Sequence, residues 1–140
     1  IVRWPGQVPA GRRSAFPWGG WDLLPTAAAL AGVKPPPGLD GIDVRAALRG
    51  EAQQRAGYLY WENVQSTFAQ AVREGDLKAV RLEPGAPIAV FDLRADPGET
   101  TDIAATQPAF VARATELFRT ARTESEHWPI AAAGKAARKK

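Results

Sequence analysis

The chain has 140 residues, of which 45% are hydrophobic and 24% charged, and this length and composition suit one compact domain with an ordinary core. It has no cysteine and a single histidine, His127, which excludes disulfides, a cysteine nucleophile and a zinc site made of several histidines within these residues. Without the four basic residues at 135–140, only 14 of the 18 basic residues remain against 15 acidic ones. We therefore expect a disordered basic tail over 131–140 and no binding of nucleic acid.

No membrane-spanning segment is predicted, because the longest apolar stretches, such as 26–33, fall far short of the roughly 20 residues that cross a bilayer. The chain starts at Ile1 and has no methionine, which indicates a piece of a longer protein. Its localisation stays open, since any export signal would lie outside these residues.

The first elements predicted are a short strand over 1–4, stopped by Pro5-Gly6, and then a loop to Gly20. Asp22 is a candidate N-cap for a helix, and Gly32 is a suitable C-terminal stop. Between them apolar residues recur at helical spacing: Leu23, Leu24, Ala27, Leu30 and Ala31.

A stiff linker is expected at 35–38, which reads Pro-Pro-Pro-Gly. A second short helix is predicted to start with Asp43 as its cap and to end at Gly50.

From Gly57 the pattern changes to that of strands, predicted at 58–61, 68–72, 77–82 and 88–93. Glu74-Gly75-Asp76 is predicted to join the second and third strands as a hairpin. Successive strands with short connections should pair antiparallel.

The segment 90–104 combines the last strand with an acidic Asp96-Pro97-Gly98 turn. An amphipathic helix should follow, since one continuous stripe is formed by Phe110, Val111, Ala114, Leu117, Phe118 and Ala121. The predicted fold class is α+β: a small antiparallel sheet of three to four strands covered by a C-terminal amphipathic helix.

The residue patterns predict no active site. Ser14, Ser66 and Ser125 lack the Gly-x-Ser-x-Gly context of a nucleophile elbow. The aspartates do not follow calcium-loop spacing, and no glycine-rich phosphate loop is present.

The whole pattern nevertheless resembles the C-terminal part of sulfatases of the arylsulfatase type. The segment 90–104 is similar to that family's strand, Asp-Pro-x-Glu turn and Asn/Asp-Leu/Ile-Ala sequence. Other segments resemble the family in the same order: Ile1-Val2-Arg3-Trp4-Pro5-Gly6, Trp21-Asp22-Leu23-Leu24-Pro25-Thr26, Leu39-Asp40-Gly41, Tyr60-Trp61-Glu62, Gln70-Ala71-Val72-Arg73 and Gly75-Asp76-Leu77-Lys78. Each match alone has a structural explanation, but their order over 1–129 favours the family.

The resemblance implies a division of the chain into four parts. Residues 1–34 would be the trailing strand-loop-helix edge of an alkaline-phosphatase-like α/β catalytic domain, and 35–56 a linker with a short helix. Residues 57–130 would be the C-terminal subdomain, followed by the tail at 131–140.

The same resemblance places catalysis outside these residues. In this family a formylglycine, made from the Cys or Ser of Cys/Ser-x-Pro-x-Arg, attacks the sulfur, and calcium neutralises the sulfate. That motif is not in this sequence, so calcium and formylglycine are expected in an upstream catalytic domain, and no catalytic or metal residue is assigned here.

Four polar residues are predicted to face a sulfate ester substrate, on the analogy that C-terminal loops shape the substrate entrance: Glu62, Asn63, Gln70 and His127. Each also has a structural interpretation. Glu62 would pair with Arg73 across the sheet, Gln70 would bond the backbone, Asn63 would lie in a turn, and His127 would be a packed or solvated terminal residue.

Two functions remain open from the sequence. The first is the C-terminal portion of a sulfatase, inactive alone, whose partners are the upstream catalytic domain and a sulfate ester. The second is a free-standing α+β binding or interaction module. The first also predicts exposed apolar surface and self-association when the chain is isolated.

Overall fold

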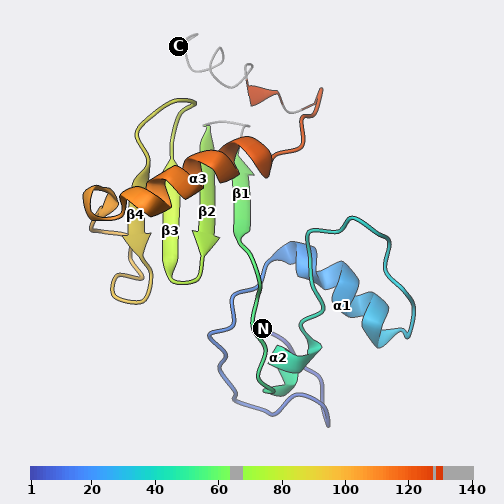
Figure 1. The fold of residues 1–140 in the computed structure, drawn as a ribbon. Helices are drawn as coiled ribbons and strands as arrows, with labels where there is room; N and C mark the ends of the chain where they lie inside the picture. The colour runs from blue at the N-terminus through green and yellow to red at the C-terminus, as the bar shows by residue number, and fades with distance from the viewer. Residues whose placement is uncertain (64–67, 128, 131–140) are drawn as a thin grey trace, which may run out of the picture. The chain divides into compact units, whose positions relative to one another are not determined.

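The computed structural model describes residues 1–63, 68–127 and 129–130 (Figure 1). Ser66 and the predicted tail at 131–140 lie outside this part of the chain. Two compact units divide between Ala56 and Gly57: unit 1 covers 1–56 and unit 2 covers 57–140. Across the described residues, no helix is both long enough and apolar enough to span a membrane.

Unit 1 contains the 3-10 turn η1 (Gly20–Asp22) and the helices α1 (Leu23–Leu30) and α2 (Arg45–Arg49). The strand predicted at 1–4 is wrong, because these residues have no strand structure. The described part of unit 1 offers no strand to pair with, so the Trp4 carbonyl instead accepts the N–H groups of Gln7 and Val8 in a turn.

The helix predicted after Asp22 is confirmed as α1, and Gly32 ends it as expected. Gly32 has φ 70°, and the Val33 N–H donates to the Ala28 carbonyl at 2.9 Å. This is a Schellman ending, in which the left-handed position favours glycine.

The second predicted helix is confirmed as α2, although it starts two residues after Asp43. The Asp43 carboxylate accepts the Arg45 N–H at 3.0 Å, so it supports the first turn from just outside the helix. Gly50, with φ 92°, closes α2.

Unit 2 is built on a four-stranded antiparallel sheet in the order β1-β2-β3-β4. The strands are β1 (Leu59–Asn63), β2 (Ala69–Glu74), β3 (Leu77–Arg81) and β4 (Ala89–Asp92). The hairpin prediction is confirmed: Glu74 pairs with Leu77 across the loop of Gly75 and Asp76. Gly75 has φ 62°, a conformation that costs glycine little.

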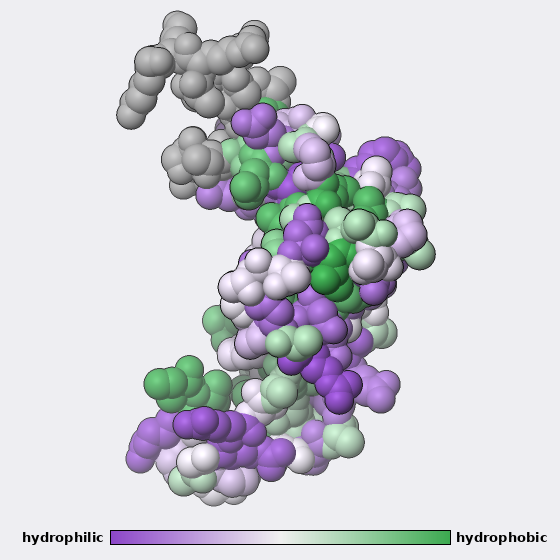
Figure 2. Space-filling view, turned by 90° about the vertical axis from the view of Figure 1, so that its left-hand side faces the viewer, coloured by the Kyte–Doolittle hydropathy of each residue, from purple (hydrophilic) through white to green (hydrophobic). Residues whose placement is uncertain are grey.

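A second 3-10 turn, η2 (Ala104–Thr106), precedes the helix α3 (Pro108–Thr120), which lies across one face of the sheet (Figure 1). The core between them consists of Val72, Ala79, Val90, Phe110, Ala114, Leu117 and Phe118. The α+β prediction of a small antiparallel sheet under an amphipathic helix is confirmed. On the face seen in Figure 2, apolar and polar side chains are interspersed, as on an ordinary protein surface.

The turn at Asp96-Pro97-Gly98 is held by its own aspartate. The Asp96 carboxylate accepts the N–H groups of Thr100 at 2.7 Å and Thr101 at 2.8 Å, and these bonds lower its pKa. Asp102 likewise accepts the Val90 N–H at 2.9 Å. The segment 90–104 thus forms a hydrogen-bonded connection between β4 and the residues that lead into α3.

Candidate functional site

A row of polar side chains crosses one end of the sheet beneath α3. The strand register places Glu62 opposite Gln70 and Gln70 opposite Arg81, so all three point to the face that α3 covers. Tyr60 joins them from the same face of β1, and Arg122 joins them from the chain just after α3. We call these five residues the sheet-end cluster.

Gln70 is the centre of the cluster and is completely buried. Its Nε2 donates to Tyr60 Oη at 2.7 Å and to Glu62 Oε2 at 2.9 Å, and it lies 3.4 Å from the Phe118 carbonyl of α3. Its Oε1 accepts from Arg81 Nε at 2.7 Å. Both ends of the amide therefore have partners, as burial of this group requires.

An ion pair ties the cluster to the chain after α3. Arg122 Nε donates to both Glu62 carboxylate oxygens, at 2.9 and 3.0 Å, and only 6% of the Arg122 side chain is exposed. A further contact at 2.5 Å joins Arg122 to Glu124. Burial alone would lower the pKa of Arg122, but its bonds to Glu124 and Glu62 outweigh this effect and raise the pKa.

Tyr60 is neutral in this setting. Burial raises the pKa of its hydroxyl, and its bond to Glu62 raises it further. The hydroxyl donates to Glu62 Oε2 at 2.7 Å. Arg81 is fixed in a second way, since its guanidinium carbon lies 4.9 Å from the centre of the Phe118 ring.

The four residues predicted to face substrate occupy different environments. Glu62 and Gln70 meet within the cluster, and Asn63 follows at the exposed end of β1. His127 is not a member of the cluster. Its side chain is 79% exposed, and its Nε2 lies 3.5 Å from Glu126 Oε1.

The alternative pairing of Glu62 with Arg73 is wrong. Arg73 pairs with Leu59 in the register, so it points to the other face of the sheet, and its Nε donates to the Gly75 carbonyl at 2.9 Å. The backbone bond expected for Gln70 is present at the Phe118 carbonyl, and three side-chain bonds accompany it.

Sequence reasoning missed Tyr60, Arg81 and Arg122. The pairing of Arg81 with Gln70 could have been found by counting outward from the two-residue turn, because the turn fixes the register of the hairpin. No local pattern marks Arg122, which lies 60 positions from Glu62.

The sheet-end cluster can position groups but has little means to react with one. Its one carboxylate, Glu62, already accepts from Arg122 and Tyr60, and Arg81 donates to Gln70. Over residues 1–63, 68–127 and 129–130, no three His, Cys, Asp or Glu side chains gather as a metal site. The single carboxylate of the sheet-end cluster is already held by Arg122 and Tyr60, so the cluster does not fit a calcium ion.

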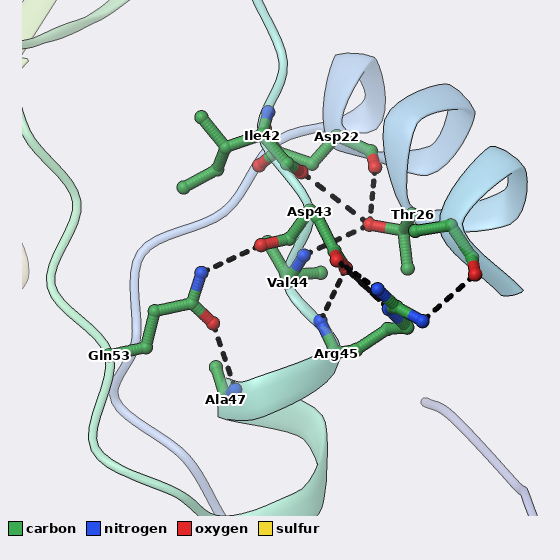
Figure 3. A network of polar contacts seen from close by, with 9 residues as sticks. Asp22, Thr26, Ile42, Asp43, Val44, Arg45, Ala47 and Gln53 are labelled. Carbon is green, nitrogen blue, oxygen red and sulfur yellow. Dashed lines mark hydrogen bonds and ion pairs between the residues drawn. The ribbon is translucent and has the colours of Figure 1, made fainter. Parts of the chain in front are cut away.

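Unit 1 contains a second polar network, centred on Asp22 and Thr26 (Figure 3). The completely buried Asp22 carboxylate accepts the N–H groups of Gly19 at 2.8 Å and Ile42 at 2.9 Å and is paired with Arg55. Burial alone would raise its pKa, but these bonds prevail and lower it.

Thr26 extends this network from α1 toward α2. Its hydroxyl donates to the Asp22 carbonyl at 2.7 Å and accepts the Val44 N–H at 3.1 Å. From the other side, Gln53 accepts the Ala47 N–H at 2.9 Å and donates to the Asp43 carbonyl at 2.7 Å. The bonds connect segments distant in sequence, so they fix the fold of unit 1.

Known proteins resemble this chain both in sequence and in fold. No family model matches the sequence. Steryl-sulfatase of Mus musculus is 39% identical over 75 residues, which is 52% of this chain and 12% of that protein. Arylsulfatase G of Rattus norvegicus is 37% identical over 85 residues, which is 59% of this chain and 15% of that protein.

Solved structures extend the similarity over both units. The crystal structure of Ps i-CgsB matches 91% of this chain and 29% of its own, with a TM-score of 0.70 and 27% identity. The BT33336S-sulf structure, concerned with the metabolism of multiple glycosaminoglycans by Bacteroides thetaiotaomicron, shares the fold over 74% of this chain and 24% of its own, with a TM-score of 0.59 and 23% identity.

The small antiparallel four-stranded sheet and its covering helix match the C-terminal region of sulfatase structures. These matches support a sulfatase C-terminal part, with similarity to steryl-sulfatase and arylsulfatase G over 52% and 59% of this chain. It spans 12% to 15% of the length of the curated relatives given above.

Proposed function

We propose that this chain is the C-terminal portion of an enzyme that hydrolyses sulfate esters, and that it serves that enzyme structurally and by shaping the substrate entrance. The observation that carries the proposal is the similarity to steryl-sulfatase, 39% identical over 75 residues, and the Ps i-CgsB match extends the similarity over 91% of this chain at 27% identity. Calcium and formylglycine belong, on this proposal, to a catalytic domain that precedes these residues.

The sheet-end cluster supports the substrate-shaping role. Because Gln70 is completely buried, it acts through its contacts: Gln70 and Glu62 hold the end of β1 and the chain after α3 in place. Asn63, at the exposed end of β1, and His127 are the two candidates for direct contact with substrate.

The relatives suggest which esters to test. Their names point to steryl and aryl sulfates, and Ps i-CgsB has also been solved in complex with k-i-k-neocarrahexaose. On this proposal the bond that is cleaved is a sulfate ester in every case. The assay therefore varies the alcohol that carries the sulfate.

The test is to express the complete polypeptide that contains this chain and, separately, the 140 residues alone. With calcium present, the complete polypeptide should release sulfate from an aryl sulfate, a steroid sulfate or a sulfated oligosaccharide, and the 140-residue chain should not. A complete polypeptide without an upstream Cys/Ser-x-Pro-x-Arg motif would contradict the proposal and favour a free-standing binding module. Robust turnover by the 140-residue chain, abolished by one substitution within it, would contradict the placement of catalysis elsewhere.

A further inference from the structure

Arg81 is held in place by neutral groups. Its Nε donates to Gln70 Oε1 at 2.7 Å, and its guanidinium carbon lies 4.9 Å from the centre of the Phe118 ring. Several other arginines of unit 2 pair with carboxylates instead: Arg113, Arg119 and Arg122. An amide oxygen and an aromatic face stabilise a cation without cancelling its charge. The positive charge of Arg81 therefore stays uncompensated.

The outer end of the Arg81 side chain is open. Within the part of the chain that the structure describes, its terminal nitrogens Nη1 and Nη2 have no hydrogen-bond or ion-pair partner. They are also not among the buried nitrogen atoms that lack a partner, so they reach solvent at this half-buried residue. A guanidinium presents its N–H groups as a planar fork, which suits two oxygens of one anionic group.

The inner contacts fix the direction in which this fork points. Gln70, which receives the Arg81 Nε–H, is itself completely buried and donates to Tyr60 and Glu62. The Phe118 ring restrains the guanidinium from the side of α3. Because the side chain is already ordered, an anion that binds it loses little of the rotamer entropy that a free arginine would lose. Arg81 is therefore preorganised for an anionic ligand.

Arg81 lies at the end of the sheet that carries a candidate for substrate contact. The register places Arg81 opposite Gln70 and Gln70 opposite Glu62, and Asn63 follows Glu62 at the exposed end of β1. Strands β3 and β1 are two strand spacings apart, about 10 Å. A ligand that meets both Asn63 and Arg81 must therefore be extended and must carry negative charge where it reaches β3.

We propose that Arg81 binds a second sulfate group of an extended, multiply sulfated substrate, a group other than the ester that is cleaved. This inference rests on the proposed function, in which calcium and formylglycine of the preceding domain act on the cleaved ester. It adds a charge requirement to the substrate. A ligand with only one sulfate leaves Arg81 unused, whereas an oligosaccharide with several sulfates engages it.

The test measures binding and turnover by the complete polypeptide and by its variants Arg81→Gln and Arg94→Gln. Arg94 is the matched control, because it is exposed and has no ion pair within the described chain, so each substitution removes one uncompensated charge. For a multiply sulfated oligosaccharide, Arg81→Gln should raise KM and the calorimetric Kd about tenfold, as loss of a hydrogen bond to a charged group does, with kcat unchanged. Its KM for a singly sulfated aryl sulfate should stay the same. Arg94→Gln should change neither KM.

A second arm changes the ligand, so it does not depend on how well a variant folds. An oligosaccharide that keeps only the cleavable sulfate should bind the unsubstituted polypeptide about tenfold more weakly than the multiply sulfated one. Arg81→Gln should bind the two with similar Kd. Equal binding of both oligosaccharides by the unsubstituted polypeptide would overturn the inference.

Equal increases in KM for the oligosaccharide and the aryl sulfate would also overturn it, because they would make Arg81 a structural residue only. Sulfate release with the same oligosaccharide Kd in the unsubstituted polypeptide and in Arg81→Gln would reject the anion site and keep the proposed function. Tenfold weaker oligosaccharide binding by Arg81→Gln, in a polypeptide that releases no sulfate, would keep the anion site and reject the proposed function.

Discussion

Gln70 is completely buried, and both the oxygen and the nitrogen of its side-chain amide are hydrogen-bonded. These bonds hold the residues around it in place. Its amide accepts from Arg81 on one side and donates to Tyr60 and Glu62 on the other. Because an unpaired buried polar group is costly, each member of the sheet-end cluster holds the next in place. The cluster is therefore best tested by removing its one carboxylate.

Glu62→Ala should destabilise unit 2 by about 2–3 kcal/mol, because the buried Arg122 guanidinium loses the carboxylate that Nε binds and keeps only Glu124, whose side chain is 83% exposed. The matched control is Glu116→Ala, which breaks the exposed ion pair with Arg119 and should cause no measurable change. Chemical denaturation followed by circular dichroism measures both. Equal effects of the two substitutions would show that the cluster contributes no more than a surface ion pair.

Asp22→Asn should weaken unit 1 at neutral pH and lose its effect in acid. The pKa of Asp22 is lowered from its ordinary value of 3.8, so the carboxylate stabilises the fold above that value, and the contribution is lost as pH falls through the lower folded pKa. At pH 7 the substitution should cost about 3 kcal/mol, since Arg55 stays buried without its partner.

The measurement for Asp22→Asn is a series of unfolding curves between pH 7 and pH 3. The difference between the two proteins should begin to shrink below about pH 4 and should go on shrinking as pH falls toward the lowered folded pKa of Asp22. A difference that stays constant with pH would mean that the carboxylate charge has no part in stabilising unit 1.

At the scale of elements, α3 is attached to the sheet mainly by its apolar side. Leu117→Ala should cost about 2–5 kcal/mol, because Leu117 is only 3% exposed in the core and truncation leaves a cavity. Arg113→Ala, on the same helix with a side chain 47% exposed, is the control and should cost much less. If both substitutions lower the melting temperature equally, apolar packing is not what attaches α3 to the sheet.

Elements governed by local chemistry were predictable from the sequence. Gly75 and Asp76 set the hairpin, Gly32 ends α1, and the stripe from Phe110 to Phe118 identifies α3. Each signal lies within a few residues of the structure it produces.

Features that depend on distant partners were not predictable. Residues 1–4 have the composition of a strand, but a strand requires a neighbour to bond with. Glu62 and Arg73 lie on adjacent strands, but a shift of one position puts side chains on opposite faces. Arg122 reaches Glu62 only after α3 has crossed the sheet.

At the scale of the whole molecule, the two units are stabilised in different ways. Among the described residues, unit 2 buries a continuous set of large apolar side chains beneath α3. The buried apolar residues of unit 1 are small or medium-sized, namely Pro25, Ala28, Val44 and Ala47, and its fold relies on the polar network around Asp22. Burial of apolar area is the main favourable term in folding, so unit 1 should be the weaker unit in isolation.

Hydrogen exchange should therefore show unit 1 opening before unit 2. In the 140-residue chain at moderate denaturant, the amides of α1 should lose protection while those of β2 and β3 keep theirs. Asp22→Asn should speed exchange in α1 and leave β2 and β3 unchanged, which provides the internal control. Simultaneous loss of protection in both units would show a single cooperative structure.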